Sequence, residues 1–437
     1  MPSSTSHDLK TRSGGKSDPV LDKARKTVGK TVKDLESDLT ELNKGIHSHP
    51  ELGYEEVYAH KTITEFLDKQ GDFKVTRHAH NLDTAFVAES GEGGNLVVFC
   101  AEYDALPGIG HGCGHNLIAT ASVTAFVAAA RALKESGKPG RLRLLGTPAE
   151  EGGGGKIKLL EAGAFVDPEG SEGQLAVAAI MAHAMSSVPG SKGTAGFRTL
   201  ASRRFRVSFH GKNAHAAVQP WAGHNALDAA VAAYSTMSML RQQIHPDERI
   251  CAVIEDGGVV PNVIPDHSRM AWVVRSTTAD AAEALYDRVK NCIEGAALAS
   301  GCKVEWEGPL LAYKDLRVNT PLCQEYIEEM ACIGEHILDK DPVVSSAGTD
   351  MGNVSQELPG FHGIFGIPAP PNVPPHHRDF ADASATPEAQ DAALQAARGM
   401  AMLALRVLLV PGLVEKVQAD FEENRSDKGS DSERSDA

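Results

Sequence analysis

Side chains that bind divalent metal ions or move protons recur along this chain, each where a segment that reads as a buried strand ends. Imidazole and thiolate groups suit zinc, and added carboxylates extend the choice to manganese or cobalt. A pair of adjacent glutamates offers one metal ligand and one free base, which are the groups that a metal-assisted hydrolase uses. The residues concerned are Cys113 and His115 in GHGCGHN, Glu150 and Glu151 in TPAEEGGGG, His183 in MAHAM, and His376 in PPHHRDF.

Each of these motifs also has an interpretation that involves no metal. GHGCGHN is a glycine-rich turn in which a cysteine and a histidine can occur by chance, and a lone histidine such as His183 is usually a hydrogen-bonded core residue. Adjacent acids such as Glu150 and Glu151 can cap a helix N-terminus, and His376 with His377 can form an exposed pair. The glycines that follow the glutamate pair do not make a nucleotide site, because no Lys-Ser/Thr pair follows in P-loop order and no GxGxxG occurs with a ribose-binding acid.

Three further residues lie near these motifs or in similar loops. We expect the carboxylate of Asp104, in EYDALPG, to orient a histidine ligand through the ring nitrogen that faces away from the metal; a solvated aspartate at a strand end is the alternative. His215, in FHGKNAHAAVQPW, and Asn262, in VVPNVIPD, have local sequences that favour capping or turn roles. An amidase with Cys113 as nucleophile is disfavoured, because no separate His-Asp relay accompanies the cysteine.

Strands that alternate with helices are expected to position these side chains. Residues 31–46, 55–70, 115–134 and 156–162 have helical character, and NLVVFCAEYD, RLRLLGTPAEE and LAVAAIMAHA read as strands. This alternation predicts an α/β fold with a mixed, mostly parallel sheet that is flanked by helices on both faces. Sites in such folds form outside the carboxyl ends of the strands, where the metal-binding motifs occur.

A different pattern occupies residues 200–311. Its order of strand, helix, two strands, helix and strand is the split βαββαβ arrangement of a ferredoxin-like α+β sandwich. We therefore predict an inserted domain that interrupts the first one. The predicted organisation is a flexible N-terminal segment over residues 1–28, a discontinuous catalytic metal-binding domain over residues 29–199 and 312–421, the inserted domain over residues 200–311, and a flexible tail over residues 422–437.

Composition and charge argue against several classes of protein. The chain has 437 residues, too many for one simple core, and 42% are hydrophobic, as in ordinary globular proteins. A formal net charge of −15 argues against binding of nucleic acid. We identify no apolar run long enough to cross a membrane, and the first residues lack the apolar core of a secretory signal. Seven scattered cysteines do not suggest a disulfide framework, so we expect a reduced, cytoplasmic setting.

With these motifs in order, the chain resembles the M20 family of metallopeptidases, in its amidohydrolase branch (subfamily D), over roughly residues 30–420. The resemblance is carried by HSHPELGYEE, YDALPG, GCGHN, PAEEGGGG, FHGKNAHAAVQPW, PNVIPD and PPHHRDF. HGCGHN, HAAVQPWAGHNALDA and AGTDMGNVSQELPG make it similar to the group that contains β-alanyl-lysine dipeptidase and the p-aminobenzoyl-glutamate hydrolase subunit. The resemblance implies a sheet domain of the metal-dependent exopeptidase type with an inserted lid and dimerisation domain.

The resemblance also implies roles for single residues. Two divalent metal ions, zinc or manganese with cobalt as a further choice, are expected, and a Cys113 thiolate is the expected bridge between them. Glu150 matches the general base, and Asp104 matches the residue that supports a ligand. His215 and Asn262 match lid residues that reach an active site, usually that of the partner subunit in a homodimer. The residues that match the metal ligands are Cys113, His115, Glu151, His183 and His376.

Some residues depart from the pattern of the branch. Asn116 and Glu102 stand where many members have aspartate, so substrate preference is not transferred from the auxin-conjugate hydrolases. His376 is preferred over His377 because it precedes Phe380 by four residues, as the family histidine precedes its aromatic residue.

The expected function is hydrolysis of an amide bond in a small N-acyl amino acid or dipeptide-like substrate. The same residues would serve amide formation in a biosynthetic pathway. A catalytically silent metal-binding scaffold is the remaining alternative, disfavoured because a scaffold does not need the free base that Glu150 offers.

Overall fold

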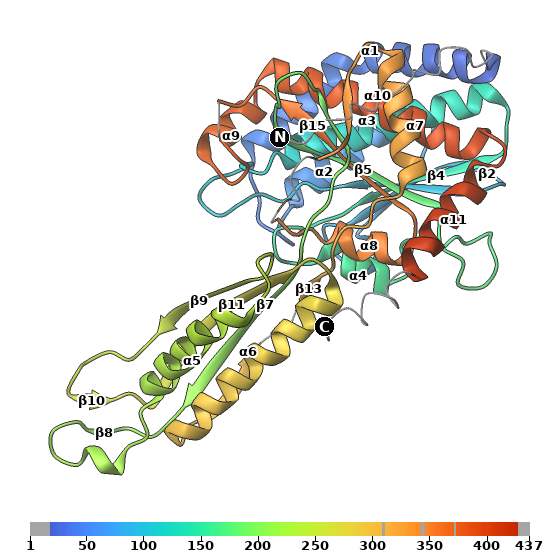
Figure 1. The fold of residues 1–437 in the computed structure, drawn as a ribbon. Helices are drawn as coiled ribbons and strands as arrows, with labels where there is room; N and C mark the ends of the chain where they lie inside the picture. Colours follow the sequence, from blue (N-terminus) through green and yellow to red (C-terminus); the bar gives the residue numbers. More distant parts are fainter. Residues whose placement is uncertain (1–17, 308–310, 342–344, 346, 371–372, 427–437) are drawn as a thin grey trace, which may run out of the picture.

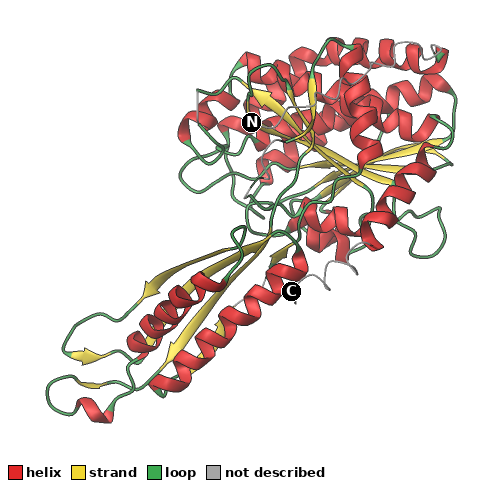
Figure 2. Ribbon diagram, in the orientation of Figure 1, coloured by secondary structure: helices red, strands yellow, loops and turns green. Residues whose placement is uncertain are grey.

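The computed structural model describes residues 18–307, 311–341, 345, 347–370 and 373–426. These residues form a rounded body of sheet and helices and a long arm of strands and two helices that extends from it (Figures 1 and 2). The body contains segments from both ends of the chain, whereas the arm comes from the middle.

The body is built on an eight-stranded mixed sheet with the strand order β1-β2-β4-β3-β5-β15-β6-β14. Neighbours β4, β3, β5 and β15 run parallel in the centre, whereas β1, β2 and β4 pair antiparallel, as do β15 and β6. This confirms the predicted α/β fold with parallel central strands. The strands are β1 (Lys74–Arg77), β2 (Phe86–Glu92), β3 (Leu96–Ala101), β4 (Gly140–Gly146), β5 (Ala178–Ser186), β6 (Gly193–Gly196), β14 (Ile337–Lys340) and β15 (Gly360–Ile367).

Helices cover both faces of this sheet, because the central strands are apolar on both sides. On one face α1, α3 and α10 pack over Val97 and Phe99 of β3, and on the other α4 and α8 pack over Val98 and Cys100 (Figure 1). The helices of the body are α1 (Pro19–Ser48), α2 (Val57–Gln70), η1 (Ala79–Asn81), α3 (His115–Ser136), α4 (Gly155–Glu161), α7 (Thr320–Cys332), α8 (Met351–Glu357), α9 (Arg378–Ser384), α10 (Pro387–Leu409) and α11 (Leu413–Ser426).

The first helix begins earlier than expected. The prediction of a flexible segment over residues 1–28 is wrong for residues 19–28, which form the first turns of α1. The side chain of Asp18 caps this helix by accepting a hydrogen bond from the backbone N of Val20 at 2.8 Å. Apolar side chains on these turns are buried in the body, which offsets the entropy lost on ordering them. Those side chains belong to Leu21, Ala24 and Val28.

Both predicted flexible segments lie at the ends of the chain. Residues 1–17 of the predicted N-terminal segment lie outside the described residues. Helix α11 continues to Ser426, so the flexible tail predicted from residue 422 is wrong for its first residues. Residues 427–437 also lie outside the described residues.

The arm has the predicted ferredoxin-like order of elements. Its sheet has the order β12-β7-β11-β9 with antiparallel pairs throughout, and α5 and α6 cover one face over a core that includes Phe205 and Trp272. The opposite face of this sheet carries no helix among the described elements (Figure 1). The main elements are β7 (Ala201–His210), α5 (Ala226–Leu240), β9 (Arg249–Asp256), β11 (His267–Ser276), α6 (Ala279–Ser300) and β12 (Lys303–Glu307). Shorter ones are β8 (Ala214–His215), η2 (Pro220–Ala222), η3 (Arg241–Gln243), β10 (Val263–Ile264) and β13 (Ala312–Tyr313).

Two helices of the body, α3 and α10, are long and apolar enough to cross a membrane by length and composition. This finding corrects the expectation that the chain has no such run. In their most apolar windows 94% and 67% of the residues are buried inside the protein. Buried core helices pass the same test, and both helices pack against the central sheet here.

Candidate metal centre

The side chains singled out by the sequence lie at the carboxyl ends of neighbouring parallel strands. Asp104 follows β3, Glu150 and Glu151 follow β4, and His183 lies in the second half of β5. Strands β4, β3 and β5 are adjacent in the sheet, so these ends meet at one edge. The loop after β3 leads to His115, the first residue of α3.

The five predicted metal ligands converge there. Ligand atoms of Cys113, His115 and His183 all lie within 4.8 Å of one another, and so do those of Cys113, Glu151 and His376. Cys113 Sγ is 3.4 Å from His183 Nε2, and His376 Nε2 is 3.0 Å from Glu151 Oε1. Cys113 belongs to both groups, which is the position that the predicted bridging thiolate requires.

Asp104 holds two parts of this cluster. Its Oδ1 is 3.0 Å from His115 Nδ1, and its Oδ2 accepts a hydrogen bond from the backbone N of Glu151 at 2.9 Å. Although burial opposes protonation of the imidazole, the Asp104 carboxylate raises the pKa of His115 well above its usual value. His115 Nε2 is buried and makes no hydrogen bond within the described part of the chain, so it is the nitrogen available to a metal ion.

The two remaining histidines are oriented by backbone contacts. His183 Nδ1 lies 2.7 Å from the carbonyl oxygen of Ala184, which leaves Nε2 for the cluster, and burial lowers the pKa of His183. His376 has a left-handed backbone with φ 69°, and its backbone N donates to Gly112 O at 2.8 Å. His377 instead caps α9, where its Nδ1 accepts from the backbone N of Asp379 at 3.1 Å. The structure thus brings His376, not His377, into the cluster.

The chemistry of the donors fits divalent cations. Burial, followed by the nearby Glu151 carboxylate, raises the pKa of the Cys113 thiol well above its usual value. Burial likewise raises the pKa of Glu150, and the carboxylates of Glu102 and Glu151 add to the effect. For Glu151 burial acts against ionisation, but the hydrogen bond with His376 lowers the pKa to about 2. A thiol crowded by carboxylates ionises when cations compensate the charge, so these residues fit a pair of divalent metal ions.

The loop that carries the two glutamates is held from several sides. Tyr313, buried in β13, donates a hydrogen bond to the carbonyl oxygen of Glu150 at 2.7 Å and accepts one from the backbone N of Gly154 at 2.9 Å. Glu56 accepts a hydrogen bond from the backbone N of Ala149 at 2.8 Å, and Ala149 has a left-handed backbone with φ 56°. A non-glycine residue in this conformation is strained, so these contacts fix an unfavourable turn at the site.

Comparison with known proteins identifies the family. Residues 96–398 match the profile of peptidase family M20/M25/M40. The chain belongs to this peptidase family. It is 38% identical over 398 residues to Xaa-Arg dipeptidase of Homo sapiens. The aligned region covers 87% of this chain and 88% of that protein. It is 33% identical over 284 residues to a p-aminobenzoyl-glutamate hydrolase subunit of Escherichia coli, covering 61% of this chain and 56% of the relative.

Solved structures of M20 proteins share the fold. A dinuclear metal-binding M20 peptidase from Bacillus subtilis matches with a TM-score of 0.61 and 22% identity, covering 86% of this chain and 99% of that one. An aminobenzoyl-glutamate utilization protein from Klebsiella pneumoniae matches with a TM-score of 0.67 and 18% identity, covering 88% and 99%. The family membership and the fold expected from the sequence are confirmed. The M20 chain is a metal-dependent amide hydrolase with a centre for two metal ions.

Three charged residues of this M20 peptidase were not predicted to belong to the site. Glu102, Lys156 and Asp350 are fully buried beside Glu150, and Lys156 Nζ contacts both Glu102 and Asp350. The only sequence signal was Glu102, which departs from the aspartate of many relatives. The other departure, Asn116, is turned away from the ligands, since its Nδ2 donates to the Oδ1 of an asparagine in α1 at 2.7 Å.

The two predicted lid residues do not reach the metal cluster of their own chain. His215 lies in β8 and Asn262 directly precedes β10, and these short strands pair at the tip of the arm, far from the body (Figure 1). The backbone N of Ala216 donates to the carbonyl oxygen of Asn262 at 3.1 Å, so the two segments are held together. His215 and Asn262 therefore form a separate group from the ligands within one chain.

Two hollows of the M20 peptidase differ in their relation to the cluster. One of about 610 Å³ lies where the arm meets the body, between Glu151 and Gly152 on one side and Arg204, Val273 and other residues of the open face of the arm sheet on the other. Through Glu151 this hollow adjoins the metal cluster.

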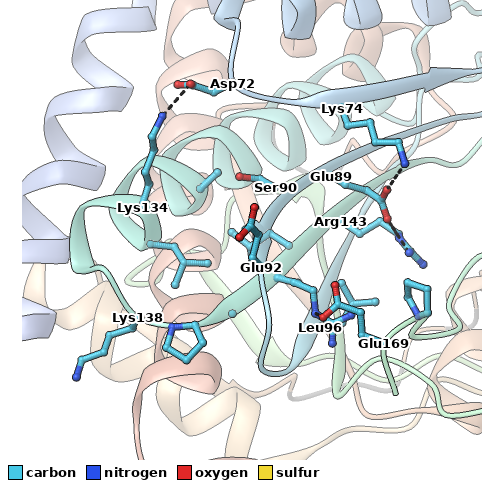
Figure 3. A pocket seen from close by; sticks show the side chains of 18 of the residues that line it. Asp72, Lys74, Glu89, Ser90, Glu92, Leu96, Lys134, Lys138, Arg143 and Glu169 are labelled. Atoms are coloured by element: carbon cyan, nitrogen blue, oxygen red, sulfur yellow. Dashed lines mark hydrogen bonds and ion pairs between the residues drawn. The ribbon is translucent and has the colours of Figure 1, made fainter. Parts of the chain in front are cut away.

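A larger hollow of about 950 Å³ lies along β2, β4 and the end of α3 (Figure 3). It adjoins the amino end of β4, opposite the metal cluster. Its charged side chains are largely paired with each other, as Lys134 with Asp72 at 2.9 Å and Arg143 with Glu89 at 2.7 Å. Paired surface charges leave little for a ligand to bind, so this hollow is not the candidate site.

Proposed function

We propose that this chain hydrolyses the amide bond of a dipeptide or N-acyl amino acid, with Glu150 as the general base. The position of Glu150 carries this proposal. Its carboxylate lies within 4.8 Å of the ligand atoms of His115 and Glu151 and is buried, yet Cys113, His183 and His376 complete the ligand set without it. Hydrolysis requires a base at the edge of the cluster, whereas a catalytically silent scaffold does not need one.

Different residues of the chain would serve different steps of such a reaction. Metal ions held by the Cys113 cluster would lower the pKa of a water molecule and polarise the substrate carbonyl. Glu150 accepts the proton of the attacking water and then delivers it to the leaving amine. Asp104 keeps His115 and the backbone of Glu151 in place while charge develops. The mixed thiolate, imidazole and carboxylate donors favour zinc or manganese, with cobalt as a substitute.

The hollow between body and arm suggests the substrate. Arg204 of β7 lines it beside Gly152, has an exposed side chain, and forms no ion pair within the described residues. Glu307 of β12 also lines it and projects from the same face of the sheet, since it pairs with Arg206 and alternate residues share a face. We assign Arg204 to the substrate carboxylate and Glu307 to a cationic side chain. A basic residue on the amine side agrees with the name of the human relative, Xaa-Arg dipeptidase.

We also propose a homodimer in which the arm of one subunit completes the active site of the other. His215 and Asn262 lie at the tip of the arm, where they cannot serve their own cluster without a large movement. Large apolar side chains are exposed along the same arm, as expected of a surface that pairs with another subunit. They include Trp221, Val231, Met239, Val259 and Leu298. A cytoplasmic location agrees with the free thiols of the described residues, which a reducing compartment preserves.

The deciding experiment is a substrate panel on metal-reconstituted protein. Dipeptides ending in arginine, lysine, alanine and glutamate, together with N-acyl amino acids, are assayed with Zn²⁺, Mn²⁺ or Co²⁺ added. We expect turnover of dipeptides with a basic second residue. No turnover of any member with any of these metals would refute the proposal.

The base is tested with Glu150→Gln. This variant is expected to retain its metal ions, as measured by inductively coupled plasma mass spectrometry. Its kcat should fall about 10²–10⁴-fold, because proton transfer to a positioned base accelerates enzyme reactions by this factor. Glu169→Gln, at a surface position, is the matched control. An unchanged kcat in Glu150→Gln would refute the base assignment.

A further inference from the structure

A buried lysine stands among carboxylates next to the metal centre. Lys156, in the first turn of α4, has no exposed surface. Its Nζ donates to Glu102 Oε1 and, at 2.6 Å, to Asp350 Oδ1, and its backbone N donates to Asp350 Oδ2 at 2.8 Å. One residue thus joins the end of β3, the start of α4 and the start of α8.

Glu150 is the third carboxylate of this cluster. Carboxylate oxygens of Glu102, Glu150 and Asp350 lie within 4.8 Å of one another, and all three residues are buried. Buried carboxylates repel one another unless a cation compensates them. A spacing of this kind suits hard divalent cations such as Mn²⁺ and Mg²⁺, which bind carboxylate oxygens.

The Lys156 ammonium occupies the position that such a cation would take. Burial opposes its charge, but the carboxylates of Asp350 and Glu102 raise the pKa of Lys156 well above its usual value, so the ammonium remains charged. A buried ammonium with two ionic contacts cannot leave without exposing uncompensated carboxylates.

The cluster also touches the metal centre itself. Glu102 Oε2 lies 3.7 Å from His115 Nε2 and has no hydrogen-bond partner within the described part of the chain. One oxygen of Glu102 is therefore held by the ammonium and the other faces a ligand nitrogen. Lys156 also follows directly on the loop that carries Glu150 and Glu151.

We propose that Lys156 is a positioning residue that acts as a built-in cation: it fills the Glu102–Glu150–Asp350 cluster, excludes a third divalent ion from it, and leaves Glu150 free to serve as the base. The kinetic part of this proposal depends on the proposed hydrolytic function, whereas the exclusion of a third ion does not. The chemistry of the cluster identifies the ion that would replace the ammonium as a hard, oxygen-seeking divalent cation.

Metal stoichiometry is the deciding measurement. The full-length wild-type chain is expected to bind two Mn²⁺ ions per subunit, by isothermal titration calorimetry and mass-spectrometric metal analysis. Lys156→Met should bind a third, because the three carboxylates remain and the ammonium is gone. Glu102→Gln/Lys156→Met, which also lacks one carboxylate, should return to two. Lys134→Met, which removes a surface ammonium paired with Asp72, is the matched control and should bind two.

The outcomes are distinct. Two ions in Lys156→Met, or three in the double variant, would overturn the proposal whatever the catalytic rate. If Lys156→Met does not fold in metal-free buffer, its refolding yield is compared with and without excess Mn²⁺. The proposal requires a Mn²⁺-dependent rescue that exceeds any seen for the double variant, and equal rescue of both would overturn it.

A kinetic readout separates positioning from general stability. The double variant is expected to keep two ions and the wild-type KM but to lose about 10–100-fold in kcat, the range found when residues that support metal ligands are changed. Loss of fold alone would also lower the apparent kcat at unchanged KM, so kcat is expressed per metal-loaded subunit. A loss that vanishes on this basis would overturn the positioning role. If no substrate of the panel is turned over, the hydrolytic proposal fails while the stoichiometry still tests the role of Lys156.

Discussion

The most consequential single contact at the residue scale is the pairing of Asp104 with His115. Oδ1 of Asp104 is 3.0 Å from the imidazole Nδ1, and Oδ2 accepts from the backbone N of Glu151. One carboxylate therefore orients a histidine ligand and the backbone of a carboxylate ligand together. Both predicted ligands are therefore held by a residue that is not expected to touch a metal.

Replacing Asp104 with asparagine should weaken metal binding. The amide keeps the shape of the side chain but removes the charge that holds the His115 ring, so we expect about a 10–100-fold lower affinity for at least one ion. Competition with a fluorescent chelator measures this loss. Asp72→Asn, at an exposed ion pair, serves as the control. Equal affinities of Asp104→Asn and the wild type would contradict the orienting role.

The sequence was sufficient to single out the side chains that converge in the cluster, because their types and neighbouring motifs were visible locally. Cys113 and His115 share one glycine-rich loop, and Glu151 adjoins the base. The lysine cluster was not visible in this way. Lys156 contacts residues 54 and 194 positions away, so its partners depend on how β3, α4 and α8 are placed by the sheet. A lysine at the start of a helix is ordinarily exposed, and nothing in its local sequence indicated burial.

At the scale of elements, the turn from β4 into α4 is the most constrained part of the site. It places Glu150 and Glu151 at the sheet edge and begins a helix within a few residues. A Cβ atom on Gly155 would lie 1.7 Å from the carbonyl oxygen of Pro148, so the two backbone segments touch there. The tight turn accordingly requires glycine at this position.

The variant Gly155→Ala should therefore be both less stable and less active. The added methyl group forces the turn apart, at a cost of about 1–3 kcal/mol in the free energy of unfolding, and displaces the two glutamates. Gly295→Ala in α6 is the matched control, because nothing lies within 4 Å of its Cβ position, and alanine should stabilise that helix by up to about 1 kcal/mol. Urea denaturation and kcat measure both effects; equal stability of the two variants would exclude the steric argument.

Elements were predictable where the apolar pattern was long and regular. The helix expected at residues 115–134 is observed as α3, and the βαββαβ order of the arm was readable from alternating strands. The short strands β1 and β6 escaped prediction because each has only four residues, too few to show a period. The start of α1 was missed because its first turns are polar on their exposed side and owe their order to burial against the body.

At the scale of the whole molecule, the metal cluster lies in the body near the base of the arm, whereas the His215–Asn262 group lies at the tip of the arm. A single chain in this conformation presents ligands and base without the lid residues. The long arm with its exposed apolar side chains would allow two chains to exchange these groups. Such an arrangement has isologous symmetry, since each subunit gives and receives the same residues.

Mixing two inactive variants tests this exchange. His215→Ala lacks the lid residue and Glu150→Gln lacks the base, so each homodimer should be inactive. A mixed dimer contains one complete site, made from the base of the first variant and the lid of the second. Random exchange yields half mixed dimers with one of two sites intact, so activity should approach about a quarter of the wild-type value. Mixing His215→Ala with a His215→Ala/Glu150→Gln chain gives no complete site and is the control. Exchange is verified by native mass spectrometry, and mixed dimers that remain inactive would mean that His215 serves its own subunit after closure of the arm.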